Sequence, residues 1–137
     1  MRRTPVAEGR RAALRRLRRA HLTEARRIRR AVADGYQLTP AHLRAPCRAH
    51  PVIEARQIAM YLMRTDLRWP TLTRSIPFPA ARIGQLLGGR DHSTVMHDIA
   101  VIAARLATDA ALRALVTDLR IRLDRTYEDP DARRRAA

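Results

Sequence analysis

The chain has no lysine, a single cysteine and no long apolar run, and each absence excludes a class of protein. Cys47 alone cannot form a disulfide framework or a cysteine-based zinc site, so a reducing cytoplasm is the simplest compartment. No apolar stretch follows the basic N-terminus, which argues against a signal peptide. No segment approaches the roughly 20 apolar residues of a membrane-spanning helix. We therefore expect a cytoplasmic protein with no membrane partner.

Motifs for catalysis and nucleotide binding are also missing. The sequence holds no glycine-rich phosphate loop of the GxxxxGK[ST] kind, and 137 residues allow one domain with tails but no additional ATPase domain. Asp91, His92 and Ser93 are adjacent, so they cannot form a catalytic relay on a helix. His92 and His97 are five residues apart and do not share a face as a metal-binding pair would. We expect no enzyme, no nucleotide, no cofactor and no metal.

Basic residues are plentiful and are all arginine. The 28 arginines outnumber 13 acidic residues, and the net charge is +15. Codon bias in a GC-rich genome would explain the choice of arginine over lysine, but it would not explain the excess of positive charge. Such an excess is typical of proteins that bind a polyanion, because neutralised phosphates release counterions.

The periodicity of apolar residues predicts an all-α fold. Caps at Thr39 with Pro40 and at Thr108 with Asp109 mark two helix starts. Expected helices cover residues 10–34, 40–43, 51–66, 80–87, 91–107 and a last segment after Asp109. Residues 1–8 and the tail after Pro130 are expected to be disordered. The proline-containing segment 67–79 is expected to be a loop, and no strand-like alternation is present.

The first expected helix is unusually basic. Twelve arginines fall within residues 1–30, against only Glu8 and Glu24. One interpretation is a helix that tracks DNA phosphates. The other is a solvated helix surface that keeps the protein in solution, and the sequence leaves both open.

The most informative motif is Gly-Gly-Arg-Asp-His-Ser-Thr-Val-Met-His, at residues 88–97. Two glycines favour a tight turn with positive φ. The turn follows one short apolar helix and precedes another whose first residues are polar. This is the arrangement of a helix-turn-helix, in which the second helix enters the DNA major groove.

The same motif resembles the signature of the C-terminal DNA-binding domain of DnaA, the bacterial replication initiator. The resemblance extends over about residues 22–123, with Ala55-Arg56-Gln57-Ile58-Ala59-Met60-Tyr61-Leu62 similar to the preceding helix and Leu38-Thr39-Pro40 similar to the entry. It implies a small multi-helix domain with a helix-turn-helix, of the DnaA domain IV or Trp-repressor-like type. We expect a basic helical extension at 1–21, the DNA-binding domain at 22–127 and a disordered tail at 128–137, as a stand-alone chain without the ATPase domain.

The resemblance also implies base-reading residues. Asp91, His92 and Ser93 would read bases in the major groove, where a carboxylate can accept from the amino group of cytosine. Arg48, eight positions before Arg56, matches the arginine that the family inserts into the minor groove, which suits a narrow and electronegative groove. A helix cap is the alternative role for Asp91, and a solvated loop arginine is the alternative for Arg48.

A second set of residues is expected to hold phosphates and so fix the register of the protein on DNA. For Gln57 the alternative is an amide on a helix surface, and for Arg56 it is an ion pair with Glu54 or Asp66. The phosphate-contacting residues implied by the resemblance are Arg56, Gln57, Arg64, Arg90, Thr94 and His97.

Two departures from the family pattern affect DNA contacts. The segment 67–79 is longer than usual, and the apolar-proline motif that touches thymine methyls reads here as Ala80-Ala81, or as Phe78-Pro79 in a shifted register. After His97 the chain continues with Asp98, where the family tends to be basic. Base preference at the thymine end of the site is therefore open.

Together these features predict sequence-specific binding of double-stranded DNA, one monomer per site, in the cytoplasm on the nucleoid. The expected target resembles a DnaA box, a short and partly T/A-rich site with a CAC-like element, linked to replication initiation or its regulation. One alternative is a stand-alone transcription regulator that uses the same module. Another is a largely nonspecific nucleoid-type protein.

Overall fold

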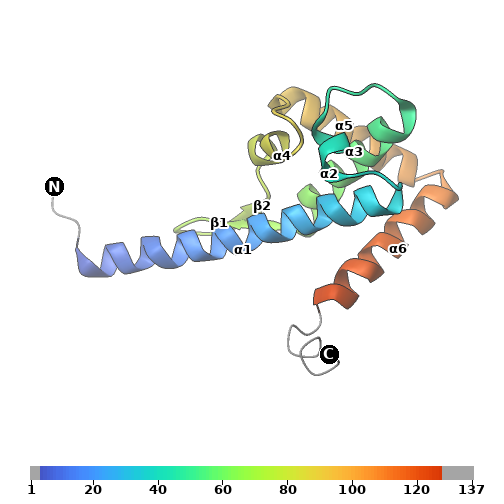
Figure 1. The fold of residues 1–137 in the computed structure, drawn as a ribbon. Helices are drawn as coiled ribbons and strands as arrows, with labels where there is room; N and C mark the ends of the chain where they lie inside the picture. Colours follow the sequence, from blue (N-terminus) through green and yellow to red (C-terminus); the bar gives the residue numbers. More distant parts are fainter. Residues whose placement is uncertain (1–3, 128–137) are drawn as a thin grey trace.

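The computed structural model describes residues 4–127 and shows six helices and one short hairpin within them (Figure 1). The predicted all-α class with a helix-turn-helix is confirmed. The expected tail at 128–137 and residues 1–3 lie outside the described part. The elements are α1 (Pro5–Gly35), α2 (Pro40–Arg44), α3 (His50–Asp66), β1 (Arg68–Pro70), β2 (Ser75–Pro77), α4 (Ala80–Leu86), α5 (His92–Leu106) and α6 (Ala110–Tyr127).

Helix α1 begins earlier than the sequence predicted. The Thr4 hydroxyl accepts from the Ala7 amide at 3.2 Å, and Pro5 occupies the first helical position, so residues 5–8 are helical and the expectation of a disordered start was wrong for them. The buried residues of α1 all lie in its second half, from Ala25 to Ala33. Its first half projects beyond the rest of the domain (Figure 1).

The segment 67–79 contains a β-hairpin where a loop was expected. Trp69 pairs with Ile76 in an antiparallel register between β1 and β2. The turn is closed by Thr71, whose amide and hydroxyl both donate to the Arg74 carbonyl oxygen at 2.7 Å. Three-residue strands are too short to show alternation in the sequence, which is why the prediction missed them.

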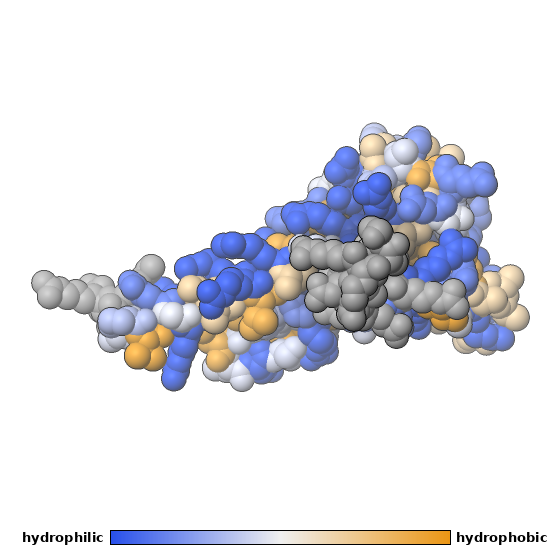
Figure 2. All heavy atoms as spheres, turned by 60° about the horizontal axis from the view of Figure 1, so that its bottom comes forward, coloured by the Kyte–Doolittle hydropathy of each residue, from blue (hydrophilic) through white to orange (hydrophobic). Residues whose placement is uncertain are grey.

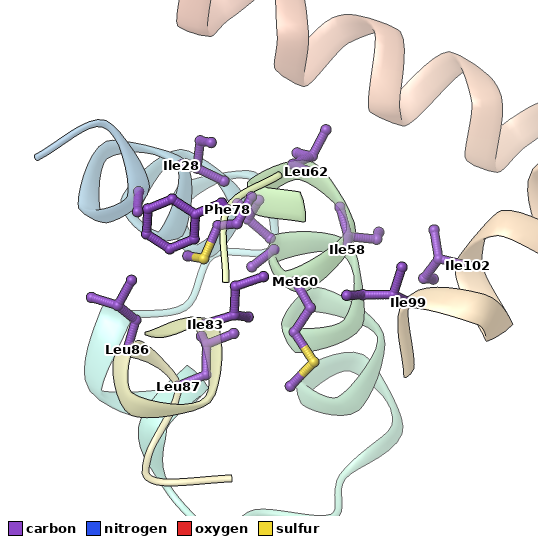
Figure 3. Packing of buried hydrophobic residues seen from close by; sticks show 14 of the residues in the cluster. Ile28, Ile58, Met60, Leu62, Phe78, Ile83, Leu86, Leu87, Ile99 and Ile102 are labelled. Atoms are coloured by element: carbon purple, nitrogen blue, oxygen red, sulfur yellow. The ribbon is translucent and has the colours of Figure 1, made fainter. Parts of the chain in front are cut away.

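The core is built around α3, which packs against α1, α2, α4 and α5. Ile58, Met60 and Leu62 of α3 are fully buried, and Figure 3 shows them among Phe78, Ile83 and residues of α5. Phe78 follows the hairpin and leads into α4, so the core fixes both the hairpin and the start of the helix-turn-helix. Within residues 4–127, no helix is long and apolar enough to cross a membrane.

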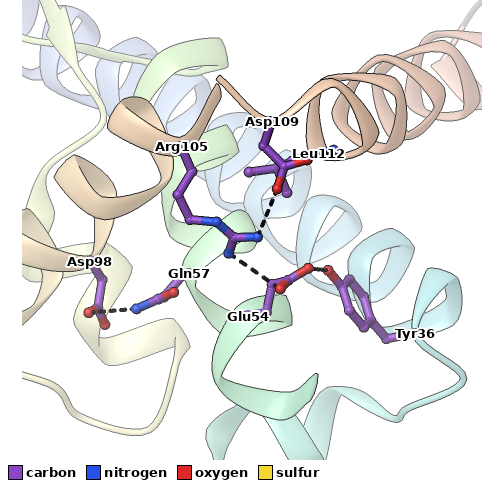
Figure 4. Close-up of polar contacts among 7 residues, drawn as sticks. All are labelled: Tyr36, Glu54, Gln57, Asp98, Arg105, Asp109 and Leu112. Carbon is purple, nitrogen blue, oxygen red and sulfur yellow. Dashed lines mark hydrogen bonds and ion pairs between the residues drawn. The ribbon is translucent and has the colours of Figure 1, made fainter. Parts of the chain in front are cut away.

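A polar network fixes the start of α6 against the other helices (Figure 4). Glu54 accepts from the Tyr36 hydroxyl at 2.5 Å and forms an ion pair with Arg105 at 3.3 Å. Arg105 also pairs with Asp109, whose other oxygen accepts from the Leu112 amide at 2.9 Å and caps α6. Burial and the hydrogen bond to Glu54 raise the pKa of Tyr36, so its hydroxyl stays protonated and keeps donating.

Candidate nucleic-acid interface

The turn between α4 and α5 depends on its glycines. Gly88 and Gly89 have φ angles of 92° and 80°, in the region that side-chain-bearing residues rarely adopt. A Cβ at Gly88 would overlap the carbonyl oxygen of Arg44, and one at Gly84 would overlap that of Arg90. The predicted glycine turn is confirmed, and it packs directly against Arg44 at the end of α2.

This turn presents the first residues of α5 to solvent. Asp91, His92, Ser93 and Thr94 are all exposed, as is His97 one turn later. Val95, Ile99 and Ile102 point into the core from the same helix. The predicted recognition helix therefore has an anchored apolar face and a free polar tip, which is the geometry that a major groove can accept.

Asp91 is the N-cap of α5, as one of its two predicted roles required. Its carboxylate accepts from the Thr94 amide at 2.7 Å, and this hydrogen bond lowers the pKa of the carboxyl group. The Asp91 side chain is nevertheless exposed. A carboxylate has several lone pairs, so the cap leaves acceptor capacity for a base.

Arg48 lies in the loop between α2 and α3 and is exposed. The buried side chain of Arg56, 5% exposed, holds this loop. Its guanidinium donates to the carbonyl oxygens of Leu43 at 3.0 Å, Ala45 at 2.9 Å and Cys47 at 3.0 Å. Burial lowers the pKa of Arg56, although arginine stays charged in proteins. The alternative prediction, an ion pair of Arg56 with Glu54 or Asp66, is wrong for this structure.

Arg90 ties the same loop to the turn. Its guanidinium donates to the Leu87 carbonyl at 3.0 Å and to the Ala45 carbonyl at 3.1 Å. Arg56 and Arg90 thus hold the same carbonyl group of this loop, which carries the expected minor-groove residue. In this structure both side chains position the loop, and a direct phosphate contact by either is untested.

Two other predicted phosphate ligands are engaged within the protein. Gln57 donates from its amide to Asp98 at 3.2 Å, which joins α3 to α5 (Figure 4). Arg64 donates to the Phe78 carbonyl at 2.9 Å, just before α4 begins. Both side chains are partly exposed, and their predicted contacts with DNA stay predictions.

Sequence reasoning missed a cluster around Trp69. The guanidinium carbons of Arg18 and Arg82 lie 5.0 Å and 5.3 Å from the Trp69 ring centroid, and Phe78 meets the ring edge-on at 5.4 Å. Arg18 also donates to the Pro70 carbonyl at 3.0 Å. The contacts join elements far apart in the sequence, so no local pattern could have revealed them.

Comparison with known proteins agrees with this geometry. The family model described as the bacterial dnaA protein helix-turn-helix matches residues 25–102, from the buried half of α1 into α5. Chromosomal replication initiator proteins DnaA are similar over stretches of about 100 residues. That of Thermomicrobium roseum is 39% identical over 102 residues, or 74% of this chain and 19% of the relative. That of Lacticaseibacillus casei is 42% identical over 95 residues, or 68% of this chain and 19% of the relative.

The chain spans about a fifth of the length of the curated relatives that it matches. The matched residues hold the buried half of α1, the hairpin, the glycine turn and the exposed tip of α5. More than half of the chain is matched by the family model, and the protein belongs to the family of the bacterial DnaA helix-turn-helix domain.

Proposed function

We propose that this protein binds double-stranded DNA in a sequence-specific manner, at sites resembling DnaA boxes, with one monomer per site. The observation that carries the proposal is the exposed tip of α5, residues 91–94, beside a rigidly held loop that carries Arg48. A recognition helix in the major groove and an arginine in the adjacent minor groove would contact bases in both grooves of one site. The family relationship supports the same reading.

The proposed base-reading residues are Asp91, His92 and Ser93 in the major groove and Arg48 in the minor groove. Thr94 and His97 would hold phosphates, since Thr94 is exposed in the tip and His97 is exposed one turn later. In the proposed division of the chain, residues 22–127 carry this function and residues 1–21 are a basic extension. The relatives are named chromosomal replication initiators, and we propose that this chain acts at replication initiation or in its regulation.

Selection of bound duplexes from a random pool tests the proposal. We expect an enriched motif, and binding to it should resist added salt better than binding to a scrambled duplex, because nonspecific affinity is almost wholly electrostatic. His92→Ala should reduce the preference, whereas the matched control His21→Ala on α1 should keep it. Equal affinity for all duplexes would indicate a nonspecific nucleoid-type protein. Selected sites concentrated at promoters would favour a transcription regulator.

A further inference from the structure

The projecting half of α1 and the β1–β2 hairpin form one unit. Arg18 of α1 lies over one side of the Trp69 cluster and Arg82 of α4 also contacts the ring. The hydrogen bond from Arg18 to the Pro70 carbonyl fixes the helix to the strand at a second point. Figure 1 shows the hairpin lying alongside α1 where that helix leaves the domain. The direction of the projecting helix is therefore set by the hairpin.

This unit carries a large excess of positive charge. Residues 4–20 contain six arginines and Glu8, and residues 67–82 contain three arginines and no acidic residue. Arg11 and Arg15 precede Arg18 at helical spacing, so they continue the row that faces the hairpin. Figure 2 shows hydrophilic side chains over much of the projecting helix, with apolar patches among them. We define the arm–hairpin surface as Arg11, Arg15, Arg74 and Arg82. Arg68 is left out, because its side chain lies on the face of the hairpin opposite to Trp69 and donates to Ser75.

Most of these arginines are free to meet a partner. All four are exposed, and among the side chains that the structure describes none of them forms an ion pair with a carboxylate. By contrast, Arg120 and Arg122 on α6 are paired with Asp66 and Asp118. Unneutralised charge held on a rigid scaffold is what a phosphate backbone requires, because each phosphate neutralised releases counterions.

We infer that the arm–hairpin surface binds the phosphate backbone of duplex DNA outside the segment read by the helix-turn-helix. The inference rests on the proposed function for the existence of a specific site, and it adds a second contact region to it. Such contacts carry no sequence information. They would lengthen the bound DNA segment and raise affinity. They would also supply phosphate contacts that α5 lacks, because Asp98 stands where the family tends to have a basic residue.

Binding to three duplexes provides the test. One carries the selected site alone, one carries the site with about one helical turn of added sequence on both sides, and a third carries a scrambled site of the longer length. The variant Arg11→Gln with Arg15→Gln is compared with Arg26→Gln with Arg30→Gln, which removes the same charge from two exposed positions in the second half of α1. Trp69 is the only tryptophan, so its unchanged emission would show that the hairpin stays docked.

We expect the wild-type protein to bind the longer specific duplex more tightly, with a steeper salt dependence. The Arg11/Arg15 variant should lose about 1.8 from that slope on the longer duplexes, at about 0.9 for each phosphate contact. Its slope on the short duplex should stay unchanged, and the control variant should keep the full difference. Equal loss on short and long duplexes, or no loss on either, would overturn the inference. Failure of the proposed function would instead appear as equal affinity for specific and scrambled sites.

Discussion

Arg56 and Arg90 donate to the same acceptor, the carbonyl oxygen of Ala45, at 2.9 Å and 3.1 Å. Arg56 comes from α3 and Arg90 from the turn before α5, so a single backbone oxygen couples the core helix, the loop of Arg48 and the recognition helix. The spacing between the two proposed groove contacts depends on this shared atom. That coupling can be measured.

A double-mutant cycle of Arg48→Ala and Arg90→Ala should be non-additive. If Arg90 fixes the loop, its removal costs part of the affinity that Arg48 contributes, and we expect a coupling energy of about 1 kcal/mol for residues in one network. Fluorescence anisotropy measures the affinity for the selected duplex of the wild-type protein, the two single variants and the double variant. The control cycle of Arg48→Ala with Arg122→Ala should be additive. Additivity in the first cycle would mean that Arg90 acts independently of the loop.

Two substitutions of Asp91 separate its role as a cap from its role in reading a base. Asn caps a helix about as well as Asp, but its second polar atom is a donor and cannot accept from a cytosine amino group. Asp91→Asn should therefore keep stability and lose discrimination at the cytosine position, by roughly tenfold. Asp91→Ala should lose both. Measured melting temperatures and affinities for single-base variants of the site check this, and uniform loss on all duplexes would leave Asp91 as a cap alone.

Helix positions could be predicted from the sequence because each helix end depends on a few neighbouring residues. Thr39 with Pro40, and Asp109 before α6, mark helix starts in the structure as they did in the sequence. Gly88 and Gly89 likewise fixed the turn, since their backbone angles exclude most other residues. Each of these signals is contained in two or three neighbouring residues.

The parts that could not be predicted depend on contacts between distant segments. The burial of Arg56 requires three carbonyl acceptors, one from α2 and two from the loop after it, which has no periodicity. The hairpin is stabilised by Arg18, more than 50 positions before the strand that it contacts. In an arginine-rich sequence, the arginines that stabilise the fold cannot be distinguished from the exposed ones. Arg18 and Arg48 differ only in the residues that surround them in the folded protein.

The two glycines of the turn should differ in tolerance. Gly89→Ala meets only backbone strain, because no atom lies within 4 Å of the added Cβ, and it should cost about 1 kcal/mol of unfolding free energy. Gly88→Ala adds a clash with the Arg44 backbone and should cost about 3 kcal/mol or more. Urea denaturation of both variants tests the ranking. Equal costs would show that the end of α2 can move away from the turn.

The cap of α6 should make stability depend on pH. Hydrogen bonding from the Leu112 amide, assisted by Arg105, lowers the pKa of Asp109 below its ordinary value of 3.8. A carboxylate with a lowered folded-state pKa stabilises the fold above 3.8, and this contribution disappears as pH falls through the lowered value. Asp109→Asn should therefore flatten the acid limb of a melting-temperature profile. An unchanged acid limb would mean that other carboxylates control it.

Asp98 should weaken DNA binding, and removing its charge should strengthen it. Asp98 lies four residues after Thr94, so it shares a helix face with a proposed phosphate ligand, and its carboxylate accepts from Gln57 at 3.2 Å. Asp98→Asn keeps a side-chain oxygen that can accept the hydrogen bond from Gln57, and it removes a negative charge close to the DNA phosphates. We expect a gain of about 0.5 kcal/mol, or roughly twofold in affinity, that shrinks with added salt. Asp118→Asn on α6 is the matched control and should change nothing. Loss of affinity in Asp98→Asn, with the fold intact, would show that the carboxylate orients Gln57 toward DNA and that orientation outweighs repulsion.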